Sequence, residues 1–116
     1  MFYLRKKMES LGVIRAMDLS NIRNGRIVRV AGSVVVRQRP GTAKGILFMS
    51  LEDETGIFNL VVMPDIFEQF RLTILTEQWL LIEGKVQNVE GVIHVQAKQF
   101  ERLEPVAPGQ ASHDFH

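Results

Sequence analysis

Five stretches of alternating apolar and polar residues lie between residues 26 and 100, and one helical stretch separates the third from the fourth. Alternation with a period of two is typical of strands that bury one face, whereas apolar residues three and four positions apart indicate an amphipathic helix. The strand stretches cover residues 26–39, 46–52, 57–63, 79–88 and 92–100, and the helical stretch covers 64–75. Gly32 and Gly84 fall inside the first and fourth strand stretches, where they allow a sharp bend.

Five strands are too few for a large sandwich, but they can roll into a small closed barrel. A helix after the third strand would cover an open end of that barrel, and the competing five-stranded barrel of the SH3 kind has no such helix there. We therefore predict an all-β chain: a five-stranded OB-fold Greek-key barrel with a short helix between strands 3 and 4 and an N-terminal helical segment. Residues 1–24 are the predicted helical linker segment, 25–104 the barrel and 105–116 a flexible C-terminal tail.

The composition is that of one ordinary globular domain. The chain has 116 residues, of which 46% are hydrophobic, enough for a sizeable core. It has no cysteine, which excludes a disulfide scaffold and thiolate chemistry and fits a reducing compartment. Its apolar runs are far shorter than the roughly 18 residues of a membrane span, and no signal-peptide pattern opens it. We predict a soluble, cytoplasmic protein with no membrane partner.

The net charge of +1 conceals a strong asymmetry along the chain. Residues 23–45 carry six basic side chains and no acid, whereas residues 46–116 carry four basic and eleven acidic side chains. Lysines and arginines that only solubilise a strand are usually mixed with acids, and here the acids are missing. The pattern indicates either a surface that faces an anion or, if the fold scatters these residues, a merely solvated strand.

Ligands of an OB-fold lie across strands 2 and 3, between the loops that join strands 1 to 2 and 4 to 5. Basic groups there attract phosphates, an exposed aromatic ring stacks on a base, and an amide reads a base edge. The predicted nucleic-acid-binding residues are Arg37, Arg39 and Lys44 for phosphates, Phe48 for stacking, and Ser50, Asn59 and Lys98 for secondary contacts. Phe48 has a second interpretation, in which it packs on the core against the first helix. His94 is expected to be an ordinary solvent-facing strand histidine, and Asp53 and Glu54 to be turn formers.

Motifs of catalysis and metal binding are weak in this sequence. No phosphate-binding glycine loop precedes a helix, no histidines stand in pairs at metal spacing, and no serine sits in a nucleophile elbow. His113, Asp114 and His116 form one candidate metal cluster, but a flexible tail would have to become ordered to use it. We predict no catalytic residue, no metal and no cofactor.

Several runs of the sequence resemble one family closely. They are residues 30–45, with the segment RQRPG, and residues 48–56, with LEDETG; shorter ones lie at 64–67, 82–86 and 112–116. The chain is similar in these runs to the C-terminal OB domain of error-prone, C-family bacterial DNA polymerases, which are related to the DNA polymerase III alpha subunit. The region 2–19 resembles the segment that joins the preceding domain to the barrel. Met63 departs from the family, where an aromatic residue is common, and its absence removes one possible stacking surface.

The resemblance implies a part of a polymerase that carries no catalytic carboxylates, because those lie in the palm domain. Such polymerases serve damage-induced translesion synthesis, and their OB domain is thought to handle single-stranded template or to contact partners. A more distant similarity is to the anticodon-binding OB domains of class II aminoacyl-tRNA synthetases. There a Phe on strand two stacks on a base, and a Gln eleven residues later reads one. Phe48 and Asn59 stand at that spacing, with the shorter Asn in place of Gln.

Together these patterns predict a module that binds single-stranded DNA weakly and with little sequence preference. The alternative is a protein-interaction module that docks on the parent polymerase domains or on accessory mutagenesis proteins. A third possibility is a free-standing RNA binder of the anticodon type. The sequence leaves open the oligomeric state and whether the chain is a fragment or a complete product.

Overall fold

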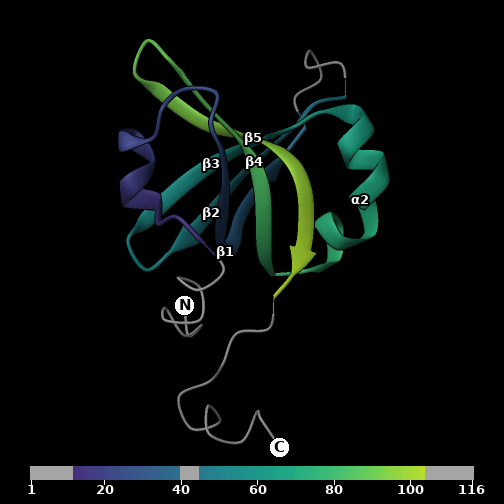
Figure 1. The fold of residues 1–116 in the computed structure, drawn as a ribbon. Helices are drawn as coiled ribbons and strands as arrows, with labels where there is room; N and C mark the ends of the chain where they lie inside the picture. Colours follow the sequence, from purple (N-terminus) through teal and green to yellow (C-terminus); the bar gives the residue numbers. More distant parts are fainter. Residues whose placement is uncertain (1–11, 40–44, 104–116) are drawn as a thin grey trace, which may run out of the picture.

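The computed structural model describes residues 12–39 and 45–103, which form a barrel of five strands with one helix on each side (Figure 1). The strands are β1 (Ile27–Gln38), β2 (Leu47–Asp53), β3 (Gly56–Val62), β4 (Trp79–Val89) and β5 (Val92–Arg102). Helix α2 (Pro64–Thr76) lies between β3 and β4, and the 3-10 helix η1 (Ala16–Asn21) precedes β1. Within the described ranges, no helix is long and apolar enough to cross a membrane.

The strands close in the order β1-β2-β3-β5-β4, so that β1 pairs with both β2 and β4. All pairs are antiparallel except β3 with β5, which run parallel. This arrangement confirms the predicted five-stranded OB-fold barrel, including the helix between the third and fourth strands. Of the predicted N-terminal helical segment, η1 lies among the described residues, while residues 1–11 lie outside them.

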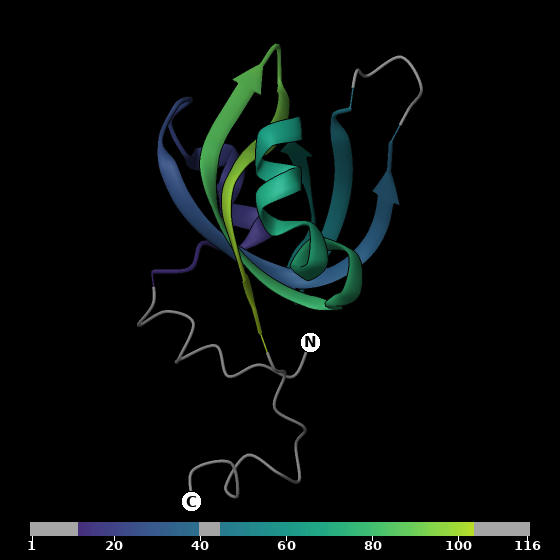
Figure 2. The ribbon, with the colours of Figure 1, turned by 90° about the vertical axis from the view of Figure 1, so that its right-hand side faces the viewer.

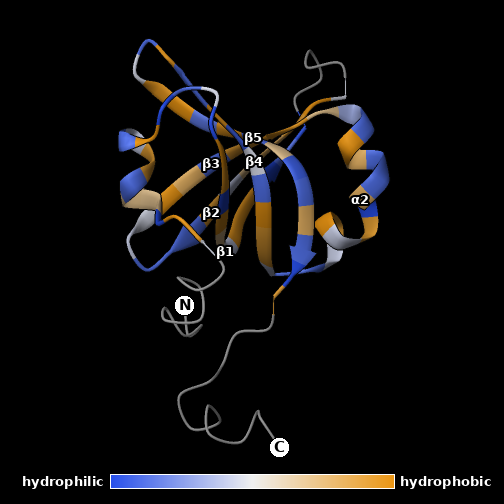
Figure 3. Cartoon of the chain, viewed as in Figure 1, coloured by the Kyte–Doolittle hydropathy of each residue, from blue (hydrophilic) through white to orange (hydrophobic). Residues whose placement is uncertain are grey.

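The core is formed by the inward side chains of the alternating strands. Met49 and Leu51 on β2 and Leu60 and Val62 on β3 are at most 2% exposed, as their spacing predicts. Figure 3 shows the same alternation as bands of apolar and polar residues along each strand. Both helices contribute to this core: α2 through Phe67 and Ile74, and η1 through Leu19. The helices therefore cover two sides of the barrel that its strands leave open.

The glycines in the long strands lie where two strands approach too closely for a side chain. A Cβ atom at Gly32 would lie 2.5 Å from the carbonyl oxygen of Glu52, and one at Gly84 would lie 2.5 Å from that of Gln96. These distances are far below van der Waals contact, so a side chain at either position requires the backbone to move. The register of β4 against β5 also shifts between Glu83 and Gly84. At the two predicted bends, Gly32 and Gly84 thus let the backbones of neighbouring strands approach each other closely.

The alternation in β1 breaks at one position that the sequence does not mark. A simple period of two places Val34 and Val36 together on the core face. The structure instead buries Val34 and leaves Val36 38% exposed, because the register of β1 against β2 shifts between them. A β-bulge of this kind adds one residue to a strand and turns the following side chains to the opposite face. The C-terminal part of β1 therefore exposes Val36 in addition to Val35.

Asp53 fastens η1 to the turn between β2 and β3. Its carboxylate is 5% exposed; one oxygen accepts hydrogen bonds from both the amide and the hydroxyl of Thr55 and from the amide of Gly56. The other oxygen accepts the backbone N–H of Ala16 at 2.8 Å. Asp53 is therefore the predicted turn former, and it also holds the segment that precedes the barrel.

Candidate nucleic-acid interface

The face predicted to bind ligands is the outer surface of β2 and β3. It is bounded on one side by the end of β1 and the start of β2, and on the other by the β4–β5 hairpin, which stand at the same end of the barrel (Figure 2). Across this surface the paired positions run from Gln38 to Phe48, from Phe48 to Val61 and from Val61 to Gln96. The register thus brings four strands together in one continuous outer row.

Phe48 lies at the centre of this row with its side chain turned out of the barrel. Its neighbours Leu47 and Met49 are buried, whereas Phe48 is 38% exposed. Its cross-strand partner Val61 is half-buried and apolar. The ring therefore has an apolar support on one side and keeps accessible surface. This exposure favours the stacking interpretation of Phe48 over the one in which it fills the core.

Ser50 and Asn59 are cross-strand partners one position further along the same face. The Ser50 hydroxyl donates to the Asn59 side-chain oxygen at 2.9 Å. Because the oxygen of the amide is directed at Ser50, its NH₂ group points away and can donate to a ligand. The structure therefore brings three of the predicted residues, Phe48, Ser50 and Asn59, into one cluster.

The two arginines at the end of β1 are held by helix α2. Arg37 donates through Nε to the carbonyl of Ile74 and through Nη2 to that of Glu77, both at 2.9 Å. These carbonyls belong to the C-terminal end of α2, where backbone oxygens lack helical partners. The Arg39 guanidinium lies 4.2 Å from the ring centroid of Phe67, a cation–π contact. Both cations have a structural role, and neither contact uses all of their N–H groups.

Of the two remaining predicted cations, Lys44 and Lys98, the structure describes only Lys98. Lys44 lies outside the described residues. Lys98 is half-buried on β5, two residues beyond Gln96. Among the described residues, Lys98 forms no ion pair; ion pairs there join Arg15 to Asp18, Arg29 to Glu83, and Arg102 to Glu77. Lys98 is therefore available to contact a ligand beside the outer row.

A polar network on the β4–β5 hairpin extends the face beyond the predicted residues. His94 Nε2 lies 2.8 Å from the side-chain oxygen of Gln87, whose NH₂ donates to the side-chain oxygen of Gln96 at 3.1 Å. The alternation along β5 places His94 and Gln96 outward, but only the pairing of Gln87 with His94 shows that they form a network. His94 is thus not an isolated solvent-facing histidine.

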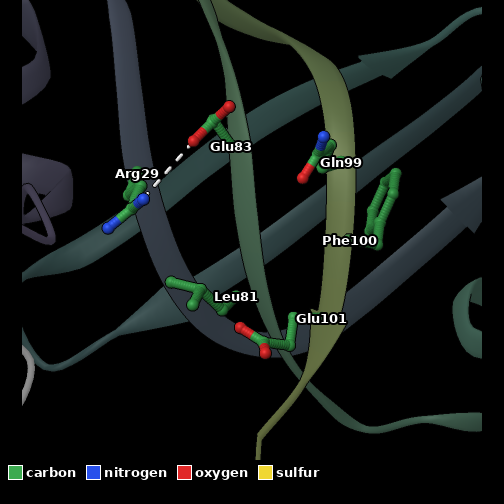
Figure 4. A pocket seen from close by; sticks show the side chains of 6 residues that line it. All are labelled: Arg29, Leu81, Glu83, Gln99, Phe100 and Glu101. Carbon is green, nitrogen blue, oxygen red and sulfur yellow. Dashed lines mark hydrogen bonds and ion pairs between the residues drawn. The ribbon is translucent and has the colours of Figure 1, made fainter. Parts of the chain in front are cut away.

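A shallow hollow of about 300 Å³ lies elsewhere on the barrel, over β1, β4 and β5 (Figure 4). It is lined by Arg29, Leu81, Glu83, Gln99, Phe100 and Glu101, and Arg29 pairs with Glu83 at 3.4 Å. Two carboxylates and one paired cation do not attract a phosphate chain. This hollow is therefore separate from the nucleic-acid face.

Metal-binding groups are absent from the described part of the chain: no three His, Asp or Glu side chains there are placed to share an ion. The tail cluster of His113, Asp114 and His116 lies outside the described residues.

A closed five-stranded barrel with a helix after β3 and an exposed aromatic ring between polar side chains defines an OB-fold domain of the nucleic-acid-binding class. The comparison with protein families agrees: the family described as OB-fold nucleic acid binding domain matches residues 28–103. This chain belongs to that family.

Two relatives and one solved structure narrow the comparison. The chain is 45% identical over 101 residues to the error-prone DNA polymerase of Caulobacter vibrioides, and 41% identical over 104 residues to error-prone DNA polymerase 1 of Rhizobium meliloti. The matches cover 87% and 90% of this chain but only 9% of each polymerase. The crystal structure of asparaginyl-tRNA synthetase from Pyrococcus horikoshii is similar with a TM-score of 0.66 and 25% identity, over 87% of this chain and 27% of that one. The predicted resemblance to error-prone polymerases, and more distantly to anticodon-binding domains, is confirmed.

Proposed function

We propose that this chain is the single-stranded-DNA-binding domain of an error-prone DNA polymerase used in translesion synthesis. The observation that carries the proposal is Phe48, an exposed ring beside the Ser50–Asn59 pair, on the outer face of a barrel that matches error-prone polymerases. Stacking on an aromatic side chain contributes about 1–3 kcal/mol per base and tolerates any base. The proposed binding is therefore weak and nearly independent of sequence.

The proposed phosphate contacts come from cations at the end of β1, beside α2, and on β5. Arg39 and Lys44 follow β1, Lys98 lies on β5, and Arg37 offers the N–H groups that α2 does not use. The basic segment 23–45 supports this assignment, since it contains no acid to repel a phosphate. We propose no catalytic role for these residues. We propose the cytoplasm as the location of the protein, because the proposed ligand is DNA. We propose residues 25–104 as the folding unit of this activity.

The direct test is fluorescence anisotropy with a labelled single-stranded DNA of about 15 nucleotides. Replacing Phe48 with Ala removes the stacking surface, so we expect affinity to fall about five- to 100-fold. Leu72→Ala is the matched control, because Leu72 is an apolar side chain 77% exposed on α2. It should leave affinity unchanged. Absence of binding at low salt, with a folded barrel by circular dichroism, would refute the proposal.

A protein-docking role is the second candidate, and one observation favours it. Ala31 and Leu81 belong to a small apolar cluster separate from the barrel core, with Val13, Leu103 and the half-buried Trp79. Val13 bridges to β1, and the amide of Leu103 donates to the carbonyl of Trp79. The chain segments that enter and leave the barrel thus lie beside β1 and β4. Neighbouring domains of a polymerase, or accessory mutagenesis proteins, would contact the barrel there. Such docking would respond little to salt.

An RNA ligand of the anticodon type is distinguished by the same assay. An oligoribonucleotide of identical sequence should bind no more tightly than the DNA if single-stranded DNA is the ligand. A clear preference for RNA would indicate contacts to the 2′-hydroxyl.

A further inference from the structure

The outer row of paired positions does not end at β5. Gln96, which pairs with Val61 on β3, also pairs with Lys85 on β4, and Lys85 pairs with Ile27 at the start of β1. Side chains of directly paired residues lie on the same face of a sheet. The row that passes Phe48 therefore continues around the barrel onto β4, where its next side chain is a cation.

A tight turn before β1 carries two further cations. Residues 23–26 form a β-turn, in which the amide of Arg26 donates to the carbonyl of Arg23 at 3.1 Å and Gly25 has a φ of 92°. A positive φ at the third position of such a turn favours glycine. The first and fourth Cα atoms of a β-turn lie within about 7 Å of each other. Both arginine side chains thus leave the chain at the two ends of one short turn.

Three hydrogen bonds fix this turn to β4. The amide of Gly25 donates to the carbonyl of Val86 at 2.7 Å, and the amide of Val86 donates to the carbonyl of Arg26 at 2.9 Å. The amide of Asn88 donates to the side-chain oxygen of Asn24 at 2.8 Å. Figure 1 shows this segment, between η1 and β1, beside the β4–β5 hairpin. Because Val86 directly follows the lysine of the outer row, the turn stands next to that lysine.

The three cations gathered here are not neutralised by the protein in the part of the chain that the structure describes. Arg23 and Arg26 are exposed, Lys85 is half-buried, and no ion pair there includes any of them. The acids nearest to them in sequence, Asp18 and Glu83, each pair with another arginine. The positive charge of the group is therefore available to an anion from outside.

We infer that Arg23, Arg26 and Lys85 form a second phosphate-binding site, on the far side of the β4–β5 hairpin from Phe48. The inference rests on the proposed binding of single-stranded DNA and extends its path: a strand that stacks on Phe48 continues past the hairpin and places phosphates on this site. Guanidinium groups match the geometry of phosphate oxygens. A shallow hollow of about 850 Å³ beside the turn is lined by residues 20–26, which contain no acid to repel the strand.

The spacing of the strands sets how long the DNA must be to reach this site. From β2 the row crosses β3 and β5 to β4, which is three strand spacings of about 4.8 Å, or roughly 14 Å. Phosphates of a stacked strand lie about 3.4 Å apart along its axis, so about four nucleotides separate a base on Phe48 from a phosphate on Lys85. A strand of about six nucleotides centred on Phe48 falls short of the site, whereas one of about 15 reaches it.

The experiment measures fluorescence anisotropy of labelled oligothymidine of about six and about 15 nucleotides with wild type and with the double variant Arg23→Ala/Arg26→Ala. The hydrogen bonds of the turn come from the backbone and from Asn24, so the variant keeps them. We expect it to bind the longer DNA about two- to 30-fold more weakly, as the loss of two exposed charge contacts implies, and the shorter DNA as wild type does. For the longer DNA, the slope of log affinity against log salt should become less steep by about 1.4.

Two controls separate this site from a general effect of charge. Arg71→Ala removes one exposed arginine from α2, which lies across the barrel from η1 (Figure 1), and it should leave the ratio of the two affinities unchanged. Arg23→Lys/Arg26→Lys keeps both charges and should retain most of the affinity for the longer DNA and most of its salt slope.

The inference is overturned if the double variant binds the longer DNA as tightly as wild type does, or if it weakens both lengths equally. If Phe48→Ala still weakens the binding of both lengths in either case, the proposed function stands. If neither oligonucleotide binds at low salt, both are refuted.

Discussion

At the scale of single residues, Asp53 shows how much a buried carboxylate can organise. Its two oxygens accept hydrogen bonds from Thr55, Gly56 and Ala16, which are the turn after β2 and the start of η1. Removing such a group leaves buried donors without partners, which costs more than the hydrogen bonds contribute. The exposed face needs this precision, because Ser50 and Asn59 lie on the two strands that the turn connects.

We expect Asp53→Ala to lower the free energy of unfolding by about 2–4 kcal/mol, since several amide groups lose their acceptor at once. Urea denaturation followed by circular dichroism measures this change. Glu52→Ala is the neighbouring control, because Glu52 is an exposed carboxylate on the same strand, and it should stay within about 0.5 kcal/mol of wild type. A loss for Asp53→Ala no larger than that of the control would show that the η1 contact contributes nothing.

At the scale of elements, α2 and the end of β1 depend on each other. Arg37 donates to two carbonyls at the end of the helix, and Arg39 covers the ring of Phe67, which α2 contributes to the core. The same two cations are proposed to hold phosphates. The structure therefore separates two contributions that the sequence cannot separate: Arg37 is tied to the helix by two hydrogen bonds, whereas Arg39 contacts the helix through the ring of Phe67.

Arg37→Ala should lower the free energy of unfolding by about 1–3 kcal/mol, because two hydrogen bonds to a charged donor are lost. Arg39→Ala should cost only about 0.5–1 kcal/mol, the value of an exposed cation–π contact. In the anisotropy assay the order reverses: Arg39→Ala weakens DNA binding more than Arg37→Ala does. Equal effects of the two variants in both measurements would refute this division.

At the scale of the whole molecule, the basic and acidic parts of the chain fold into one barrel. The basic segment 23–45 contains the whole of β1, and the acidic residues 46–116 supply the other four strands. Only some of the basic side chains flank the outer row: Arg29, for example, pairs with Glu83 at the hollow on β1 and β4. Folding thus distributes the charge, and few cations remain for phosphates.

The salt dependence of binding measures how many cations take part. Each phosphate neutralised on a single strand changes the slope of log affinity against log salt by about −0.7. Three or four phosphate contacts, from Arg39, Lys44, Lys98 and in part Arg37, give an expected slope of about −2 to −3. A slope near zero for a complex that still forms would instead indicate an apolar docking surface, and the second candidate function would then be preferred.

Much of the fold could be predicted because the strands alternate and the helix does not. Residues such as Met49, Leu60 and Val62 are buried as their spacing indicates, and α2 begins at Pro64 as predicted. The period of two fails at Val36, because a bulge depends on how β1 pairs with β2 and leaves no signal in the alternation. For the candidate site, the exposed Phe48 and the Ser50–Asn59 pair were within reach of sequence reasoning.

The sequence by itself determined the class of barrel, since the order of strands, the single helix and Gly32 and Gly84 admit few other arrangements. It also determined which residues of β2 face outward, because side chains alternate along a strand. Only the tertiary structure decided the partners of those residues. Hydrogen bonds join Gln87 to Gln96, nine residues further along the chain, and Arg37 to Ile74, 37 residues further along. A hydrogen bond depends on distances across strands, and only closure of the barrel fixes those distances.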